Sequence, residues 1–392
     1  MSVSRNPLRT SVAACVGRTR AEAEDIAAAV AVDFEELPVN ADTLDSARAP
    51  KSKIHEHWSD NIFLEAETVA GDIAAIAASA PVKVSRQIRM ARQCMVPLEG
   101  KGVVAAWERQ AEQLTLHTST QMPHIVRQGL AECLGVDQGS IRVIAPDVGG
   151  GFGYKGLLQP EEVIAAWLAR ALDHPVRWIE DRREHLVAAA NAREHCYEIT
   201  GYADDKGRLL GLDALVWVDA GAYSIYPFTA GLEAAQVASI LPGPYDFAHY
   251  RCRTFSVCTN KPPIVPYRGV ARTGVCLAIE QIMDAIAGAV GREPHEVRLI
   301  NLVPPEKMPY VNVTRKHFDS GDYPESMRRA VAAIDLAGVR ARQKKGGAGG
   351  RRIGVGLGVY CEQAGHGTAV YQAWGIPMVP GHEQAQARLT PD

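Results

Sequence analysis

The sequence predicts a mixed α+β protein that contains more than one domain, and three observations support this class. The 392 residues, 47% hydrophobic and 22% charged, match a soluble globular chain long enough for two or three cores. Apolar runs of strand length alternate with segments whose apolar residues recur at helical spacing. A glycine-rich loop, residues 148–156, follows an apolar run and precedes a helix start at Pro160.

Local signals place the individual helices and strands. The capping box Thr19-Arg20-Ala21-Glu22 predicts a helix to about Val30, followed by a strand over 30–34. The other predicted elements are strands within 81–113, a helix over 121–134, a buried strand over 141–148, a helix over 160–172, a strand over 176–179, a β-hairpin over 196–219 with its turn at 204–207, a helix containing 279–290, a helix from 322 to about 334, and a strand over 353–360.

Composition excludes several functional classes. A net charge of −3 provides no electrostatic basis for binding nucleic acid. No apolar run approaches the roughly 18 residues of a membrane span, and no signal segment is visible, so we expect a cytoplasmic protein. The eight cysteines include no C-x-x-C pair, which excludes the ligand spacing of zinc ribbons and iron–sulfur centres.

The glycine loop permits two interpretations. Its letters include G-x-G-x-x-G, and Glu180 follows the next strand, as the ribose-binding acid does in nicotinamide-dependent dehydrogenases. However, the helix begins after the loop, with Glu161 and Glu162 in its first turn, where they would repel a phosphate. The helix position counts against the dehydrogenase, which is kept as an alternative, and the bare backbone of the loop can also lie against another large ligand.

Five segments in fixed order support the other interpretation. The loop segment RVIAPDVGGGFGYK (142–155) is accompanied by QCMVPLE (93–99), QMPH (121–124), TN…YRG (259–269) and DSGDY (319–323). Together they closely resemble the molybdopterin-binding large subunit of the xanthine dehydrogenase and aldehyde oxidase family. The PGPYD segment (242–246) is most similar to the carbon-monoxide-dehydrogenase-like branch of that family.

The resemblance implies a cofactor site. In this family, the glutamine that begins the segment corresponding to QCMVPLE (93–99) hydrogen-bonds the apical oxygen of molybdenum. That role falls on Gln93. Backbone amides in the glycine loop can hydrogen-bond the metal's ligands without adding charge. The implied cofactor-binding residues are Gln93, Gly150, Gly151, Phe152, Gly153 and Arg268. Among these, Gln93, Phe152 and Arg268 are expected to lie beside the metal.

The implied substrate pocket contains Gly156, Gln236, Gly269 and Val270. Purine-oxidising relatives carry a glutamate, an arginine and a phenylalanine where this chain has Gly156, Gln236 and Val270. Carbon monoxide dehydrogenases have a copper-binding cysteine at the position of Gly269. These departures favour an aldehyde or a non-purine heterocycle, which would be oxidised with oxygen derived from water.

The resemblance also implies a domain order and partners. A partial hammerhead-type α/β domain (1–70) would precede the first molybdopterin-binding domain (80–340), a linker (341–352) and the start of a second such domain (353–392), with the chain truncated at both ends. The family's catalytic glutamate lies in that second domain beyond residue 392, so no catalytic residue is assigned.

The expected cofactor is molybdenum-molybdopterin, in a dinucleotide form. The expected partners are an iron–sulfur small subunit, an FAD-binding medium subunit and possibly a separate chain carrying the C-terminal half. A non-catalytic truncated paralogue is a further alternative to an active enzyme.

Overall fold

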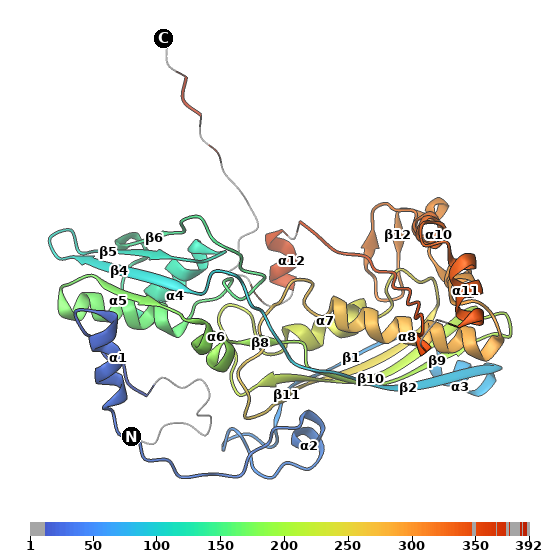
Figure 1. The fold of residues 1–392 in the computed structure, drawn as a ribbon, viewed down its shortest axis with the longest axis horizontal. Coiled ribbons are helices and arrows are strands. Elements are labelled where there is room, and N and C mark those ends of the chain that lie inside the picture. The colour runs from blue at the N-terminus through green and yellow to red at the C-terminus, as the bar shows by residue number, and fades with distance from the viewer. Residues whose placement is uncertain are drawn as a thin grey trace.

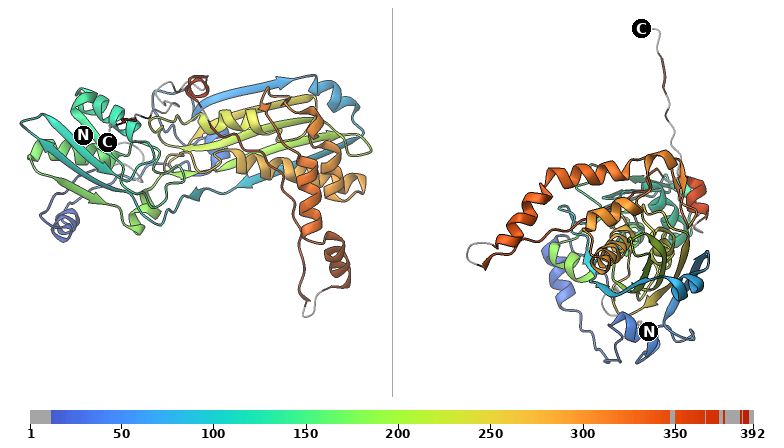
Figure 2. Two further views of the ribbon diagram at one scale, coloured as in Figure 1. Left: turned by 90° about the horizontal axis from the view of Figure 1, so that it is seen from above. Right: turned by 90° about the vertical axis from the view of Figure 1, so that its right-hand side faces the viewer.

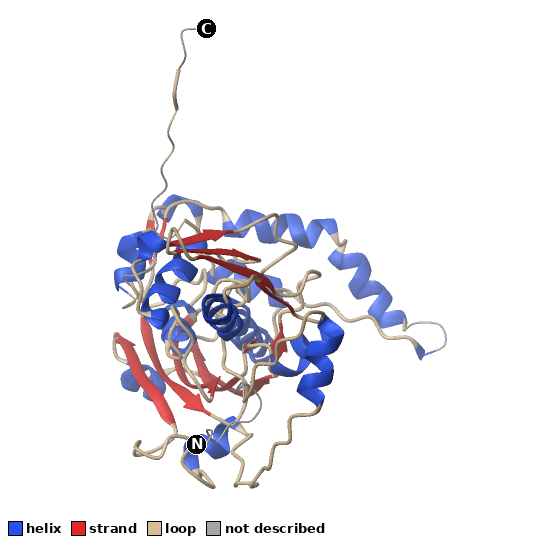
Figure 3. Ribbon diagram, turned by 90° about the vertical axis from the view of Figure 1, so that its left-hand side faces the viewer, coloured by secondary structure: helices blue, strands red, loops and turns tan. Residues whose placement is uncertain are grey.

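Two β-sheets, each covered by its own helices, divide the protein into two lobes (Figure 1). The computed structural model describes residues 12–346, 350–365, 367–373, 376, 385 and 387–389. Viewed from the end of the smaller lobe, the strands form separate groups with helices between them (Figure 3). This is the mixed α+β class that the sequence predicts.

The larger sheet has five strands in the order β1-β11-β10-β9-β2. All neighbours are antiparallel except the parallel pair β10–β11. The strands are β1 (Ile62–Ala70), β2 (Val82–Met90), β9 (His195–Ala203), β10 (Leu209–Gly221) and β11 (His249–Cys258). Helices α7 (Leu232–Ile240) and α8 (Arg272–Val290) pack on the sheet and contribute to the main hydrophobic core.

The smaller sheet has four strands in the order β6-β5-β4-β7. They are β4 (Gly102–Glu108), β5 (Gln113–Thr118), β6 (Ile141–Ile144) and β7 (Val176–Ile179). Helices α4 (Pro123–Leu134) and α5 (Pro160–Leu172) cover it, and a second core of alanine, leucine and valine side chains lies between them and the sheet.

A two-strand ribbon lies between the lobes. It pairs β3 (Gln93–Cys94) with β8 (Asn191–Ala192), so segments almost 100 residues apart run side by side. The remaining elements are α1 (Arg20–Ala28), α2 (Thr43–Arg48), α3 (Ile73–Ser79), α6 (Arg182–Ala188), α9 (Pro294–Asn301), β12 (Tyr310–Val311), β13 (His317–Phe318), α10 (Tyr323–Ala333), α11 (Leu336–Lys345), α12 (Thr368–Ala373) and two short 3-10 helices, Gln138–Ser140 and Pro305–Lys307. Helices α10 and α11 extend outward from the larger lobe (Figure 2).

The helix starts follow the local capping signals. Thr19 accepts a hydrogen bond from the Glu22 amide at the start of α1, as predicted. Gln159 and Glu162 form a capping box at α5, with Pro160 in the first turn. Strands β9 and β10 form the predicted antiparallel hairpin.

Three predicted strands require correction. Residues 30–34 form no strand: they are exposed, and among the described residues no strand pairs with them. Residues 353–360 are also not a strand, because they run beside α8 and α9 without pairing to another strand. The strand predicted over 141–148 ends at Ile144, and the following Pro146 lacks the amide that a ladder hydrogen bond needs.

Helix α8 is long and apolar enough to cross a membrane by length and composition alone, but half of its most apolar window is buried inside the protein. It packs against β2 and β9 as a core helix. Its Glu280 forms an ion pair with Arg298 of α9 at 2.7 Å. The packing of α8 against the larger sheet accounts for its apolar residues.

Two elements of the structure fall in the regions where domain boundaries are predicted. Strand β1, in the region expected to form a separate first domain, is an edge strand of the larger sheet. Helix α11 continues into the expected linker as far as Lys345, and residues 347–349 of that linker lie outside the described residues. The domain boundaries themselves remain predictions.

Candidate functional site

The glycine loop lies between β6 and α5 and closely approaches the turn at 266–269. A Cβ atom on Gly153 would lie 1.9 Å from the Pro266 carbonyl oxygen, and Gly153 has φ +103°. Gly150 also has a positive φ, +91°. Both positions require glycine: Gly153 for the close backbone approach and Gly150 for its left-handed conformation.

Glu99 fixes the two ends of the glycine loop. It accepts hydrogen bonds from the Gly149 amide (2.9 Å) and from the buried Lys155 ammonium (2.6 Å). Burial opposes ionisation of Glu99, but these bonds outweigh burial and lower its pKa. The lowered pKa favours the ionised carboxylate, which attaches both ends of the glycine loop to the segment that follows β3.

Glu180 makes a second, more buried attachment. It accepts hydrogen bonds from the Tyr154 hydroxyl (2.7 Å) and the Lys101 amide (2.8 Å), and it contacts His185 Nδ1 at 3.0 Å. Burial raises its pKa, but these partners outweigh burial, so the net shift is downward. With its oxygens engaged, Glu180 is unavailable to bind a ribose.

The sheet order also counts against a nicotinamide-binding fold. Such a fold needs the strand before the loop and the strand after the helix to be adjacent and parallel. Here β6 and β7 lie at opposite edges of the smaller sheet. The glycine loop therefore does not lie in the crevice in which a Rossmann-type fold binds a nicotinamide dinucleotide.

The residues expected beside the metal lie together. The Arg268 amide donates to the Phe152 carbonyl at 2.9 Å, and the Arg268 guanidinium lies 5.8 Å from the centre of the Phe152 ring. Arg193 donates to Gln93 Oε1 at 3.3 Å and also to the Arg268 carbonyl. Gln93, Phe152 and Arg268 thus surround one region, with Phe152 41% exposed.

The rest of the loop is held by Gln121, the first residue of the QMPH segment. Its Oε1 accepts the Gly153 amide at 2.9 Å and packs on Gly151. Gly150 lies next to the Phe152 ring and Pro97. All six residues predicted to bind the cofactor therefore belong to one connected set of contacts.

Three of the four predicted substrate-pocket residues are also neighbours. Arg272, the first residue of α8, lies 3.4 Å from both Gln236 Oε1 and the Gly269 carbonyl. Val270 follows Gly269 in the same turn, with φ +48°. Gly156 lies apart from them: it is buried, and its amide donates to the Gly153 carbonyl at 3.0 Å.

Comparison with known proteins decides the family. The sequence pattern of the molybdopterin cofactor-binding domain matches residues 54–302. The chain belongs to the molybdopterin cofactor-binding domain family.

Several relatives place the chain among the molybdenum hydroxylase large subunits and close to the carbon monoxide dehydrogenase branch. The nicotine 6-hydroxylase large subunit of Paenarthrobacter nicotinovorans is 33% identical over 375 residues, covering 95% of this chain and 46% of that protein. The carbon monoxide dehydrogenase large chain of Hydrogenophaga pseudoflava is 32% identical, covering 91% and 47%. These matches confirm the resemblance inferred from the sequence.

A solved structure gives the same result. Quinoline 2-oxidoreductase from Pseudomonas putida 86 matches with a TM-score of 0.87 and 34% identity, covering 92% of this chain and 46% of that one. The chain thus spans about half the length of the relatives it matches.

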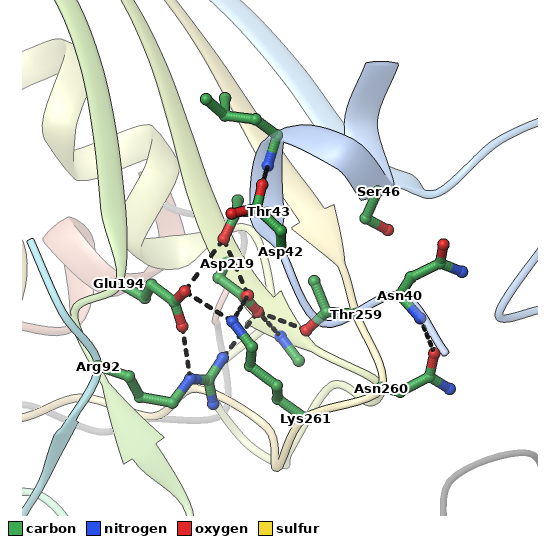
Figure 4. A network of polar contacts seen from close by, with 12 residues as sticks. Asn40, Asp42, Thr43, Ser46, Arg92, Glu194, Asp219, Thr259, Asn260 and Lys261 are labelled. Carbon is green, nitrogen blue, oxygen red and sulfur yellow. Dashed lines mark hydrogen bonds and ion pairs between the residues drawn. The ribbon is translucent and has the colours of Figure 1, made fainter. Parts of the chain in front are cut away.

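The molybdopterin-binding domain has a charged network around Asp219 that includes Arg92, just before β3, and Glu194, just after β8 (Figure 4). Asp219 pairs with Arg92 at 2.7 Å and with Lys261 at 2.9 Å, and both cations also pair with Glu194. Burial raises the pKa of Asp219, but Arg92 and Lys261 outweigh it and the pKa is lowered. Because Arg92 precedes Gln93 and Glu194 follows Arg193, this network fixes the backbone that carries both site residues.

The residues at the site are chemically suited to a molybdopterin group. Arg193 Nε is buried without a hydrogen-bond partner, and the Gln93 side chain is exposed. Among the described residues no three His, Cys, Asp or Glu side chains converge as metal ligands. The site offers neutral amides and the guanidinium groups of Arg193 and Arg268, which suit a cofactor that carries its own metal ligands.

Sequence reasoning did not single out several residues of this site. Glu99 and Gln121 lay inside recognised segments, so their roles could have been suspected. Arg193 and Arg272 carried no such signal, because each acts through contacts made far along the chain.

Proposed function

We propose that this chain forms the molybdopterin-facing part of the active site of a molybdenum hydroxylase. The observation that carries the proposal is the convergence of Gln93, Phe152 and Arg268 through Arg193 and the glycine loop. Membership of the molybdopterin cofactor-binding domain family supports the same conclusion. The dinucleotide form of the cofactor remains a prediction.

The side chains and amides of the site would bind and orient the cofactor. The Gln93 amide would donate to a ligand of the metal, and the missing Cβ of Gly153 lets the glycine loop lie directly against the turn at 266–269 that carries Arg268. Phe152 would exclude water from one side. When bound, the molybdenum centre would supply the two-electron oxidation that transfers water-derived oxygen to the substrate.

We favour a non-purine nitrogen heterocycle as the substrate, with an aldehyde as the second choice. Gly156, Gln236 and Val270 lack the acid, cation and ring of purine-oxidising relatives. Two relatives at 33% and 34% identity are named for nicotine and quinoline. Gly269 provides no thiol for a copper ion.

The electron path would require other chains. The described chain has no clustered cysteines for iron–sulfur centres. Relatives are named as a large subunit and as subunit gamma of a complex, which supports partner subunits. We therefore expect an iron–sulfur small subunit and an FAD-binding medium subunit, with a further chain possibly supplying the second molybdopterin-binding domain. Cytoplasmic location remains a prediction.

The test is metal analysis and turnover of the complex purified from its native host through a tag on this chain. We expect molybdenum in the complex and oxidation of quinoline-type substrates, with no urate formed from xanthine. Gln93→Ala should lower kcat by roughly 10- to 100-fold, the usual loss when a group supporting a metal is removed, while the melting temperature stays unchanged. A complex without molybdenum would favour the non-catalytic paralogue, and urate formation would contradict the substrate class.

A further inference from the structure

Arg193 connects two loops of the proposed site. It follows β8 directly, has φ +63° and is only 5% exposed. One terminal nitrogen donates to Gln93 Oε1, 100 residues away along the chain, and the other donates to the Arg268 carbonyl, 75 residues away. The guanidinium also lies 4.2 Å from the centre of the Tyr267 ring.

This contact determines which way the Gln93 amide faces. A guanidinium has only donors, so the atom of Gln93 that meets Arg193 must be its oxygen. The Gln93 amide nitrogen is then directed away from Arg193 and is free to donate. A metal oxygen ligand needs such a donor, whereas a flipped amide would present an acceptor.

A buried acid, Glu233, acts on the charge of Arg193. Glu233 on α7 is 3% exposed, and its Oε1 contacts His195 Nε2 at 2.9 Å. His195 is fixed in turn by the Tyr197 hydroxyl, 2.7 Å from Nδ1. Glu233 Oε2 and Arg193 Nε are both buried and both lack a hydrogen-bond partner. Burial lowers the pKa of Arg193, and the charge of Glu233 acts in the opposite direction without reversing the shift.

We propose that Arg193 is a positioning residue that orients the Gln93 amide and the Arg268 peptide toward the cofactor. The inference rests on the proposed function. Arg193 does not belong to the segments that identify the family. Arg193 does not need to touch the substrate, because its effect passes through Gln93 and the turn at 267–269.

Two substitutions in the native complex test the inference. Arg193→Lys keeps the charge but loses the two-pronged donor geometry, and Arg193→Gln loses both. The control is Arg208→Gln: like Arg193, Arg208 bridges a backbone carbonyl, of Ile300, and a side-chain oxygen, of Asp246, but it lies at the opposite end of β10 from Gly221. The readouts are molybdenum per chain, kcat and KM, the paramagnetic resonance spectrum of the molybdenum centre, and a crystal structure.

For Arg193→Lys we expect molybdenum content and KM within about twofold of wild type, kcat lowered roughly 10- to 100-fold, and an altered resonance spectrum. Arg193→Gln should also lose molybdenum, and Arg208→Gln should change none of these quantities. If Arg193→Gln does not fold, Arg193→Lys still decides the matter.

A wild-type kcat and spectrum in Arg193→Lys, with Gln93 unmoved in the crystal structure, would overturn the positioning role alone. A wild-type complex free of molybdenum would overturn the proposed function, and with it the role assigned to Arg193.

Discussion

Two arginines that flank the β3–β8 ribbon, Arg92 before β3 and Arg193 after β8, differ in how fully their nitrogens are hydrogen-bonded. Arg92 meets Glu194, Asp219 and the Pro262 carbonyl, so all three of its nitrogens are engaged. Among the described residues, Arg193 donates to two neutral oxygens and lies against the Tyr267 ring, while its Nε has no hydrogen-bond partner. Full pairing is typical of a group that stabilises the fold, whereas an open buried donor is typical of a group facing a ligand.

The largest expected difference comes from replacing each arginine with methionine. Arg92→Met should lower the free energy of unfolding by about 3 kcal/mol, because it leaves excess negative charge buried at Asp219 and Glu194. Arg193→Met should cost only about 1 kcal/mol, because methionine fills the space, one open donor disappears and His195 still contacts Glu233. Chemical denaturation of the two variants measures both values, and equal losses would contradict the distinction between them.

The second prediction concerns the glycine loop. Gly153→Ala should destabilise the chain by about 1–3 kcal/mol and lower molybdenum content, because its Cβ would collide with the Pro266 carbonyl. Gly135→Ala is the matched control: it has φ +64° but no atom within 4 Å of the added Cβ. It should cost about 1 kcal/mol from backbone strain alone and leave molybdenum content unchanged. Equal effects would mean that the close approach at Gly153 has no importance for the site.

The smallest effect is expected in acid. Glu180 has its pKa lowered below the ordinary value of 4.5, so its contribution to stability is complete above about pH 4.5 and is lost as the pH falls through the folded-state pKa. Glu180→Gln should therefore make the loss of stability below pH 4.5 shallower. Glu198→Gln, at the exposed ion pair with Arg48, is the control and should leave the slope almost unchanged. An unaltered slope in Glu180→Gln would show that Glu180 makes no pH-dependent contribution.

Local signals allowed most of the fold to be predicted. The starts of α1 and α5 depend on side chains within three residues of Thr19 and Gln159, so the sequence identifies them directly. The strands expected at 30–34 and 353–360 failed because a strand also needs a partner, which its own residues do not specify.

The site could be predicted only in part, for a similar reason. Family segments identified Gln93, Phe152 and Arg268 as candidates, and the structure brings them together. The residue that joins them, Arg193, could not be found, because its partners lie 75 and 100 residues away and no spacing rule relates them. Glu233 was hidden in the same way, since its buried partner His195 is 38 residues earlier in the chain.

The pairing of β1 with β11 affects biosynthesis. Glu65 of β1 and Arg253 of β11 form an ion pair although 188 residues separate them. At a ribosomal rate of roughly 5–20 residues per second, β1 waits on the order of 10–40 seconds for its neighbour to be made. During that interval the edge of β1 lacks its partner strand, so the larger sheet cannot be complete before residue 258 has been made.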